Sequence, residues 1–157
     1  MISYGSKVLA SANYDFAADP SGGAVGTIKM GLNLPGNIQA GSRVTITNIW
    51  VTAKKLLTSG GAATLSFGLQ AGVNGVLTTN AAKLMAANVL AAFNTNTDAQ
   101  GNFQPVQGAI GAANPVKLYP SAAVGAITGW DVIMVIGGFP LTAGSLQIDI
   151  ECNVTPQ

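Results

Sequence analysis

The stretch Gly41–Leu69, GSRVTITNIWVTAKKLLTSGGAATLSFGL, constrains the fold of this chain more than any other part of the sequence. Its first half alternates apolar and polar residues with a period of two, which is typical of a half-buried β-strand. At Asn48 the alternation changes phase, and the apolar positions that follow are Ile49, Val51 and Ala53. One extra residue swaps the two faces of a strand in this way, so a β-bulge or sharp bend is predicted near Asn48.

The same stretch continues through a turn into a second strand. Thr58–Gly61 (TSGG) has the composition of a turn, because glycine tolerates the positive φ that a reversal needs. In the following segment, 63–69, every second residue is apolar. Two alternating strands joined by a glycine-rich turn favour an antiparallel β-sandwich or barrel.

Four further segments have strand patterns, namely 24–34, 116–119, 131–136 and 145–154. The apolar run 131–136 suits a strand that is covered on both faces, and 145–154 alternates most regularly. Pro140–Gly144 (PLTAG) is predicted to be a turn. About eight strands with short glycine-rich turns predict an all-β fold, an antiparallel β-sandwich or jelly roll, in a single domain over residues 1–157.

Two segments add to this plan. Residues 80–92 lie in an alanine-rich run, with Thr79 or Asn80 as an N-cap, and predict one short α-helix that packs against a sheet or a subunit. Residues 1–23 end in a flexible DPSGG joint. They form either an edge strand of their own domain or an extended N-terminal arm on a neighbouring subunit.

Charge and hydropathy exclude several classes of partner. Only 8% of the residues are charged and the net charge is +1, so nothing in the sequence favours nucleic acid or an anionic membrane. A surface so poor in charge is typical of contact with other protein, although a soluble protein with a bland polar surface is the alternative. No apolar run approaches the length of a transmembrane helix, and no signal peptide is expected.

The sequence offers little material for catalysis or metal binding. It has no histidine, and its one cysteine, Cys152, falls in phase with buried strand positions. Asp149 and Glu151 share a strand face and in principle suit a glycosidase pair, but a solvated polar face explains them better. No phosphate-binding glycine loop is present. We therefore expect no enzyme activity, no catalytic residues, no cofactor and no metal.

Three aromatic residues are candidates for contact with a partner: Phe103, Trp50 and Trp130. Phe103 lies in a long polar and glycine-rich segment, 94–114, which is predicted to be a surface loop with a short strand at Phe103–Val106. An exposed Phe103 would suit a contact, whereas the simpler alternative is that its ring tucks under its own loop.

Two segments also resemble small virion proteins of tailed bacteriophages: Ile38 to Leu90, with its threonine and glycine turn followed by the A-T-x-S-x-G strand, and Trp130 to Val154, with its L-T-A-G-x-L closing hairpin. The resemblance implies a capsid decoration (cement) protein, a jelly roll that assembles as a homotrimer. Its partners would be the major capsid protein or other virion proteins. It would be made in the host bacterial cytoplasm and sit on the outer capsid surface of the virion, with no nucleic acid or membrane as partner.

Two alternatives remain open at this stage. One keeps the virion but makes the chain a head-fibre, tail or adhesion module that binds a host glycan, through exposed aromatic residues such as Trp50, Trp130 or Phe103. The other places it outside viruses, as a carbohydrate-binding β-sandwich domain.

Overall fold

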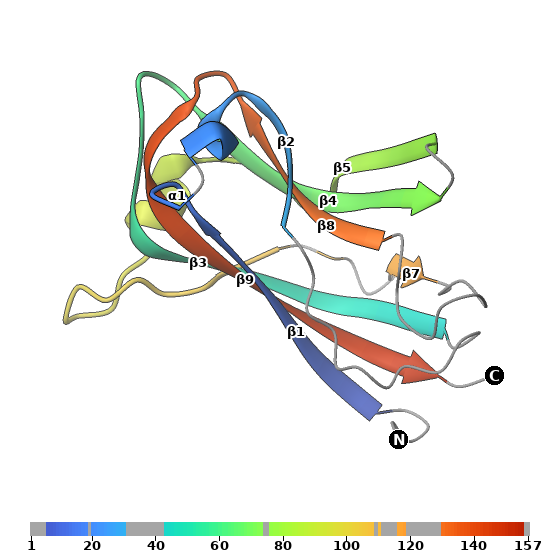
Figure 1. Cartoon of the computed structure of the whole chain (residues 1–157). Helices are drawn as coiled ribbons and strands as arrows, with labels where there is room; N and C mark the ends of the chain where they lie inside the picture. Colours follow the sequence, from blue (N-terminus) through green and yellow to red (C-terminus); the bar gives the residue numbers. More distant parts are fainter. Residues whose placement is uncertain are drawn as a thin grey trace.

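Two antiparallel sheets pack face to face in the computed structural model of the chain (Figure 1). The structure describes residues 6–18, 20–30, 43–73, 76–108, 110, 116–118 and 130–155. Sheet A is made of β1 (Ser6–Asp15), β9 (Leu141–Thr155), β3 (Arg43–Ser59), β6 (Val106–Gln107) and β7 (Val116–Leu118). Sheet B is made of β2 (Gly26–Lys29), β8 (Trp130–Gly137), β4 (Thr64–Val73) and β5 (Val76–Val89).

The strand order is that of a jelly roll. Sheet A has the order β1-β9-β3, with β6 and β7 both paired to β3, and sheet B has the order β2-β8-β4-β5. Most connections cross from one sheet to the other, whereas β4 and β5 form a hairpin within sheet B. All the strand pairs are antiparallel. The predicted all-β sandwich is therefore confirmed.

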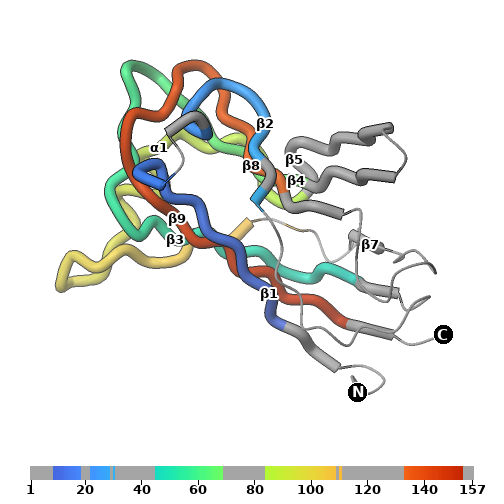
Figure 2. Tube along the Cα trace, in the orientation of Figure 1, coloured from blue at the N-terminus to red at the C-terminus, as the bar shows by residue number. Residues whose placement is uncertain are grey.

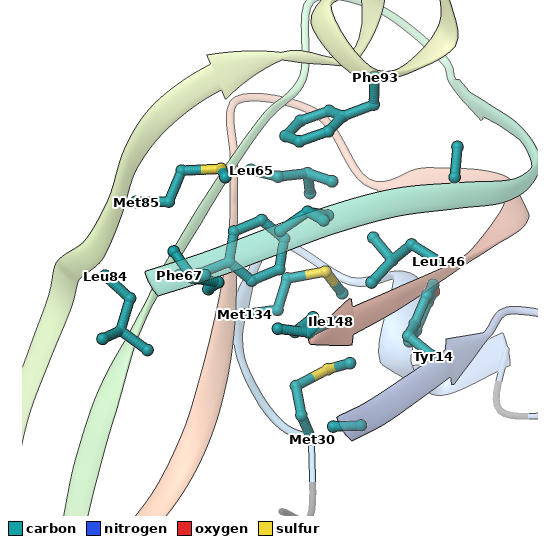
Figure 3. Close-up of a cluster of buried hydrophobic side chains, with 14 of the residues drawn as sticks. Tyr14, Met30, Leu65, Phe67, Leu84, Met85, Phe93, Met134, Leu146 and Ile148 are labelled. Atoms are coloured by element: carbon teal, nitrogen blue, oxygen red, sulfur yellow. The ribbon is translucent and has the colours of Figure 1, made fainter. Parts of the chain in front are cut away.

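Residues predicted from the alternating pattern to be buried line the space between the sheets (Figure 3). Ile148 and Ile150 of β9 and Ile49 and Val51 of β3 are each 0% exposed. Phe67 of β4 and Met134 of β8 are equally buried and approach them from sheet B. The inward faces of both sheets thus supply one apolar core, as in other sandwiches.

The bulge predicted at Asn48 is confirmed. Ile46 pairs with Cys152 of β9 and Asn48 pairs with Glu151, so β3 advances by two residues while β9 advances by one. The extra residue restores the core face, because Ile46 before it and Ile49 after it are both fully buried.

The helix predicted over 80–92 is wrong for most of its length. Val76–Val89 form β5, and the helix α1 covers only Leu90–Asn94. Between the pairs Leu65–Asn88 and Leu69–Asn80, β4 advances four residues and β5 advances eight, so β5 is strongly bulged. The bulges allow the adjacent residues Leu84 and Met85 both to be buried. Pairing and burial against the core here override the helix propensity of alanine, which is a weak preference.

One predicted turn is wrong and another is found. Pro140–Gly144 is not a turn, because β9 begins at Leu141, and the chain reverses instead at Gly138, where φ is +79°. The closing hairpin expected at this position is also absent, because β8 belongs to sheet B and β9 belongs to sheet A. The predicted turn at Thr58–Gly61 is found, since the chain bends at Gly60 and Gly61, and it carries the chain from sheet A to sheet B.

The first strand lies at one edge of sheet A. Ser6–Asp15 form β1, which pairs with β9 from Ser6–Val154 to Asp15–Ser145. Within the described chain the segment is thus an edge strand of sheet A, and the alternative of an arm on a neighbouring subunit stays a prediction. A short 3-10 helix, Pro20–Gly23, follows it and leads to β2. Met1–Gly5 lie outside the described residues, and the single-domain assignment of residues 1–157 stays a prediction.

Candidate interaction surfaces

The structure places the three predicted contact residues on three different elements. Trp50 lies in β3 of sheet A and is half-buried, and Phe103 lies in the segment between α1 and β6. Phe103 is also half-buried, and its ring packs against the core. Trp130 is the first residue of β8 in sheet B, and its side chain lies outside the described part of the structure. Trp50 and Trp130 therefore belong to opposite sheets, and their role in contacts stays a prediction.

The outer face of sheet A, the face turned away from sheet B, is polar around Trp50. In the register of the sheet, Trp50 stands between Gln107 of β6 and Asp149 of β9, and Ser11 of β1 follows beyond Asp149. The next row toward the chain reversal is Thr52, Gln147 and Asn13. Trp50 is thus an aromatic side chain surrounded by amides, hydroxyls and a carboxylate.

The two carboxylates that share this face are bound by their neighbours. Asp149 accepts a hydrogen bond from Gln147 Nε2 at 2.8 Å. Glu151 Oε1 accepts hydrogen bonds from Thr47 Oγ1 at 3.0 Å and from Asn48 Nδ2 at 3.1 Å. Both acids therefore belong to the polar network of the sheet surface, as the simpler interpretation of the sequence expects.

Asn94, at the end of α1, fixes the start of the next loop. Its Oδ1 accepts a hydrogen bond from the Leu57 N–H at 3.0 Å, and its Nδ2 donates one to the Leu57 carbonyl at 2.7 Å. The side chain thus satisfies both backbone groups of Leu57, where β3 departs from regular pairing with β9. This contact holds the beginning of the loop 95–105 against β3.

Asp98 organises the loop 95–105, which projects from the body of the sandwich (Figure 2). Its Oδ1 accepts hydrogen bonds from the backbone N–H groups of Gln100 and Asn102, both at 2.9 Å. Its Oδ2 accepts one from Asn102 Nδ2 at 3.0 Å and one from Gln104 Nε2 at 3.2 Å. Gly101, with φ of +82°, makes the tight turn. The loop is therefore a built element with a fixed backbone path.

These hydrogen bonds make the loop dependent on pH. Donors from Asn102, and then from Gln100 and Gly101, lower the pKa of Asp98 from its ordinary value of 3.8. A lowered pKa means that the ionised form favours the ordered loop. The stabilisation is present above pH 3.8 and is lost as the pH falls through the lower native pKa.

Replacing Asp98 by asparagine is expected to loosen the loop at neutral pH. The new amide nitrogen would face Asn102 Nδ2 and Gln104 Nε2, which are donors that need an acceptor. The check is the heteronuclear NOE of the backbone amides of residues 99–104, which should fall in Asp98→Asn and stay unchanged in the control Asp149→Asn. Equal NOE values in the variant and the wild type would contradict this role for Asp98.

An open groove of about 340 Å³ lies between this loop and β3. Its lining consists of Thr52, Ala53, Lys54, Gly101, Asn102 and Phe103. Thr52 belongs to the same outer face of sheet A as Trp50, two residues along β3. The groove therefore joins the polar face that carries Trp50, and it brings Phe103 to the same side of the molecule.

A second surface is apolar. Large hydrophobic side chains that are exposed in the described chain are Val25 (53%), Leu56 (56%), Val89 (57%), Phe139 (49%) and Leu9 (64%). The first four lie at one end of the sandwich, which we call the apolar end, whereas Leu9 lies further along β1, opposite Glu151.

The strand register and close contacts bring these four residues to the same end. Thr64, at the start of β4, pairs with both Val89 and Gly137, and Gly26, next to Val25, pairs with Ile136. The Phe139 ring lies against Gly61, so the β8–β9 connection touches the β3–β4 connection at this end (Figure 1). Leu56 of β3 lies beside Gly144, shortly after the start of β9.

One feature of the sequence predicts part of this surface. Leu56 and Leu57 are adjacent in a strand, so only one of them can face the core, and Leu57 does (2% exposed). The helix predicted over 80–92 includes Val89, which in the structure is the last residue of β5. The position of Phe139 depends on the packing of two connections far apart in the sequence, which no local pattern reveals.

Two further titratable groups have defined surroundings in the described chain. Burial, with a smaller contribution from Glu151, raises the pKa of the Cys152 thiol from 9.0 to about 12. Asp15 makes an exposed ion pair with Lys55 at 3.2 Å. Among the described residues no group of three or more histidine, cysteine, aspartate or glutamate side chains could hold a metal ion, and no helix there is long and apolar enough to cross a membrane.

Comparisons with known proteins leave the family open. No protein-family model and no curated protein matches the sequence. A solved structure described as "Acidic stable capsid structure of Helicobacter pylori bacteriophage KHP30" aligns with 98% of this chain and 90% of that chain. The TM-score is 0.48 and the sequence identity is 10%.

Proposed function

We propose that the chain is a non-enzymatic structural protein of a tailed-bacteriophage virion, a capsid decoration (cement) protein that binds and stabilises the outer head shell. The observation that carries the proposal is the apolar end. Four large hydrophobic side chains, each about half exposed, lie at the same end of the sandwich, with Val25 and Val89 at opposite edges of sheet B. Exposed apolar surface concentrated at one end of a domain is a candidate for a protein contact.

Two further arguments support a virion role. The sequence resembles small virion proteins of tailed phages along the central strands and along β9, and only 8% of its residues are charged. A surface poor in charge suits a protein that is covered by copies of itself and by a shell. In this proposal the chain is a homotrimer made in the host cytoplasm, and its partner is the major capsid protein.

The contact of one subunit with the shell would be weak. Full burial of a large apolar side chain contributes roughly 1.5–3 kcal/mol, and about half of each of the four is already covered. The four together therefore contribute on the order of 3–6 kcal/mol before the cost of association. A trimer that engages three sites at once would convert such weak contacts into stable attachment.

Attachment to heads tests the proposal. Purified protein is mixed with DNA-filled heads of the encoding phage that lack it, and bound copies are counted after sedimentation. Phe139→Asp and Val89→Asp each place a charge at the apolar end, and we expect each to weaken attachment by about tenfold or more.

Leu9→Asp is the matched control, because it makes the same kind of change at an exposed site away from the apolar end. Circular dichroism confirms that all three variants are folded. Full attachment of both apolar-end variants would refute the assignment of this surface, and no attachment of the wild-type protein would refute the decoration role.

A further inference from the structure

We propose that the outer face of sheet A around Trp50, together with the groove beside it, binds a neutral oligosaccharide. This inference goes beyond the decoration role, because shell attachment is assigned to the apolar end. It starts from Trp50 itself, which lies on the outer face and so adds nothing to the core between the sheets. Among the described residues its indole N–H has no hydrogen-bond partner.

The neighbours of Trp50 supply polar groups on both sides. Gln107 and Asp149 flank it across the sheet, and Thr52 follows it along β3. A hexose presents an apolar C–H face and a rim of hydroxyl groups. An aromatic ring with amide, carboxylate and hydroxyl groups around it matches both parts, because each sugar hydroxyl can donate and accept hydrogen bonds.

The groove extends this face by a second wall. Its volume of about 340 Å³ lies at the lower end of the range of small-ligand sites. Phe103 provides a second aromatic ring, and Thr52 and Lys54 provide groups that make no hydrogen bond within the described chain. A short oligosaccharide could therefore run from Trp50 into the groove.

The wall is rigid before any ligand arrives. Asp98 holds the backbone of Gln100 and Asn102, and Asn96 Nδ2 donates to the Gln104 carbonyl at 3.1 Å and to the Pro105 carbonyl at 3.0 Å. A site that is already ordered loses little conformational entropy on binding. A small entropy loss matters for sugars, because they bind proteins weakly.

The charges next to Trp50 do not favour an anionic ligand. Asp149 and Glu151 lie near Trp50, while Lys54 lies in the groove and Lys55 is already paired with Asp15. A nucleic acid or a phosphorylated ligand requires an excess of positive charge. The basic positions Lys7 and Lys117 belong to the row of Asn153, further along the sheet from Trp50. The many polar groups likewise make this face a poor surface for an apolar partner.

Fluorescence of Trp50 tests the inference. The sequence has two tryptophans, so Trp130→Phe leaves Trp50 as the single reporter. This variant is titrated with maltohexaose, cellohexaose and mannohexaose, and the wild-type protein is applied to an array of neutral bacterial polysaccharides. We expect a saturable change in Trp50 emission with at least one neutral chain.

Variants locate the binding. Trp50→Ala, made in the wild-type chain, is expected to weaken retention on the positive polysaccharide by about tenfold or more, and Asp149→Asn by less. Val25→Ala, an exposed site next to β2 of sheet B and so away from the face that carries Trp50, should bind as the wild type does. Absence of binding to every neutral polysaccharide, or equal binding by Trp50→Ala, would overturn the inference.

A change of solution mass in Trp50→Ala would also overturn it, since this face would then contact a second copy of the chain. The two proposals can fail separately. If Trp50→Ala loses the polysaccharide but still attaches to heads, both stand, whereas head attachment without any sugar binding removes only the inference.

Discussion

Replacing Phe67 by alanine is expected to lower the free energy of unfolding by about 3–5 kcal/mol. Phe67 is 0% exposed at the centre of β4 and pairs with Met134 of β8 and Met85 of β5. Its ring meets Phe93 of α1 edge-on, with centroids 6.3 Å apart and an interplanar angle of 82°. The substitution removes this contact and leaves a cavity that the bulged β5 cannot close fully.

Phe139→Ala is the matched control, because it makes the same chemical change at a side chain that is 49% exposed. It should cost about 1 kcal/mol or less, since about half of its apolar area is already in water and no closed cavity forms. Urea unfolding followed by circular dichroism measures both values. Equal losses in the two variants would contradict the assignment of Phe67 to the core.

Gly144→Ala is expected to destabilise the protein by about 2–4 kcal/mol. Gly144 has φ of +118°, a conformation that side-chain-bearing residues rarely adopt. A Cβ atom there would lie 2.8 Å from the Leu56 carbonyl oxygen and 2.8 Å from Leu57 Cα. These are backbone atoms of β3, so the clash can be relieved only by separating β3 from β9.

Alanine substitutions at two other glycines distinguish the cost of backbone strain from the cost of the steric clash. Gly101→Ala combines φ of +82° with open space around the new Cβ, so it should cost about 1–2 kcal/mol from backbone strain alone. Gly60→Ala meets neither obstacle and should be close to neutral. If Gly144→Ala were no more destabilising than Gly101→Ala in urea unfolding, the close approach of β3 and β9 would be refuted.

The sheet architecture was predictable because a strand with one buried face has apolar and polar residues in alternation. In β9, Leu146, Ile148, Ile150 and Cys152 are buried while Gln147, Asp149, Glu151 and Asn153 are not. The phase change at Asn48 located a bulge for the same reason. A strand with one buried face records its register in its own sequence.

The helix prediction failed in segment 76–89, where apolar and polar residues do not alternate regularly. Segment 76–89 has alanine at four positions, and a side chain of one methyl group adds little apolar area to mark a buried face. The bulges in β5 erase the period of two, so only the pairing with β4 reveals a strand. Propensity then remained as the sole local signal, and it favoured the wrong element.

The candidate surfaces were predictable in part. Trp50 could be assigned to the outer face from its phase in β3, but its position next to the groove depends on Asn94 and Asp98, which fix a distant loop. The apolar end depends on two crossing connections that meet only in three dimensions. Such sites arise from tertiary contacts, which the spacing of residues in one segment cannot encode.

The copy number of the chain on purified virions decides whether it is a structural protein of the head. Particles of the encoding phage are purified on a density gradient, and quantitative mass spectrometry compares this chain with the major capsid protein. A structural role on the head predicts a fixed ratio that persists through purification and falls when Phe139→Asp replaces the wild-type chain. Absence of the chain from purified particles, with the protein remaining free in the lysate, would contradict the account.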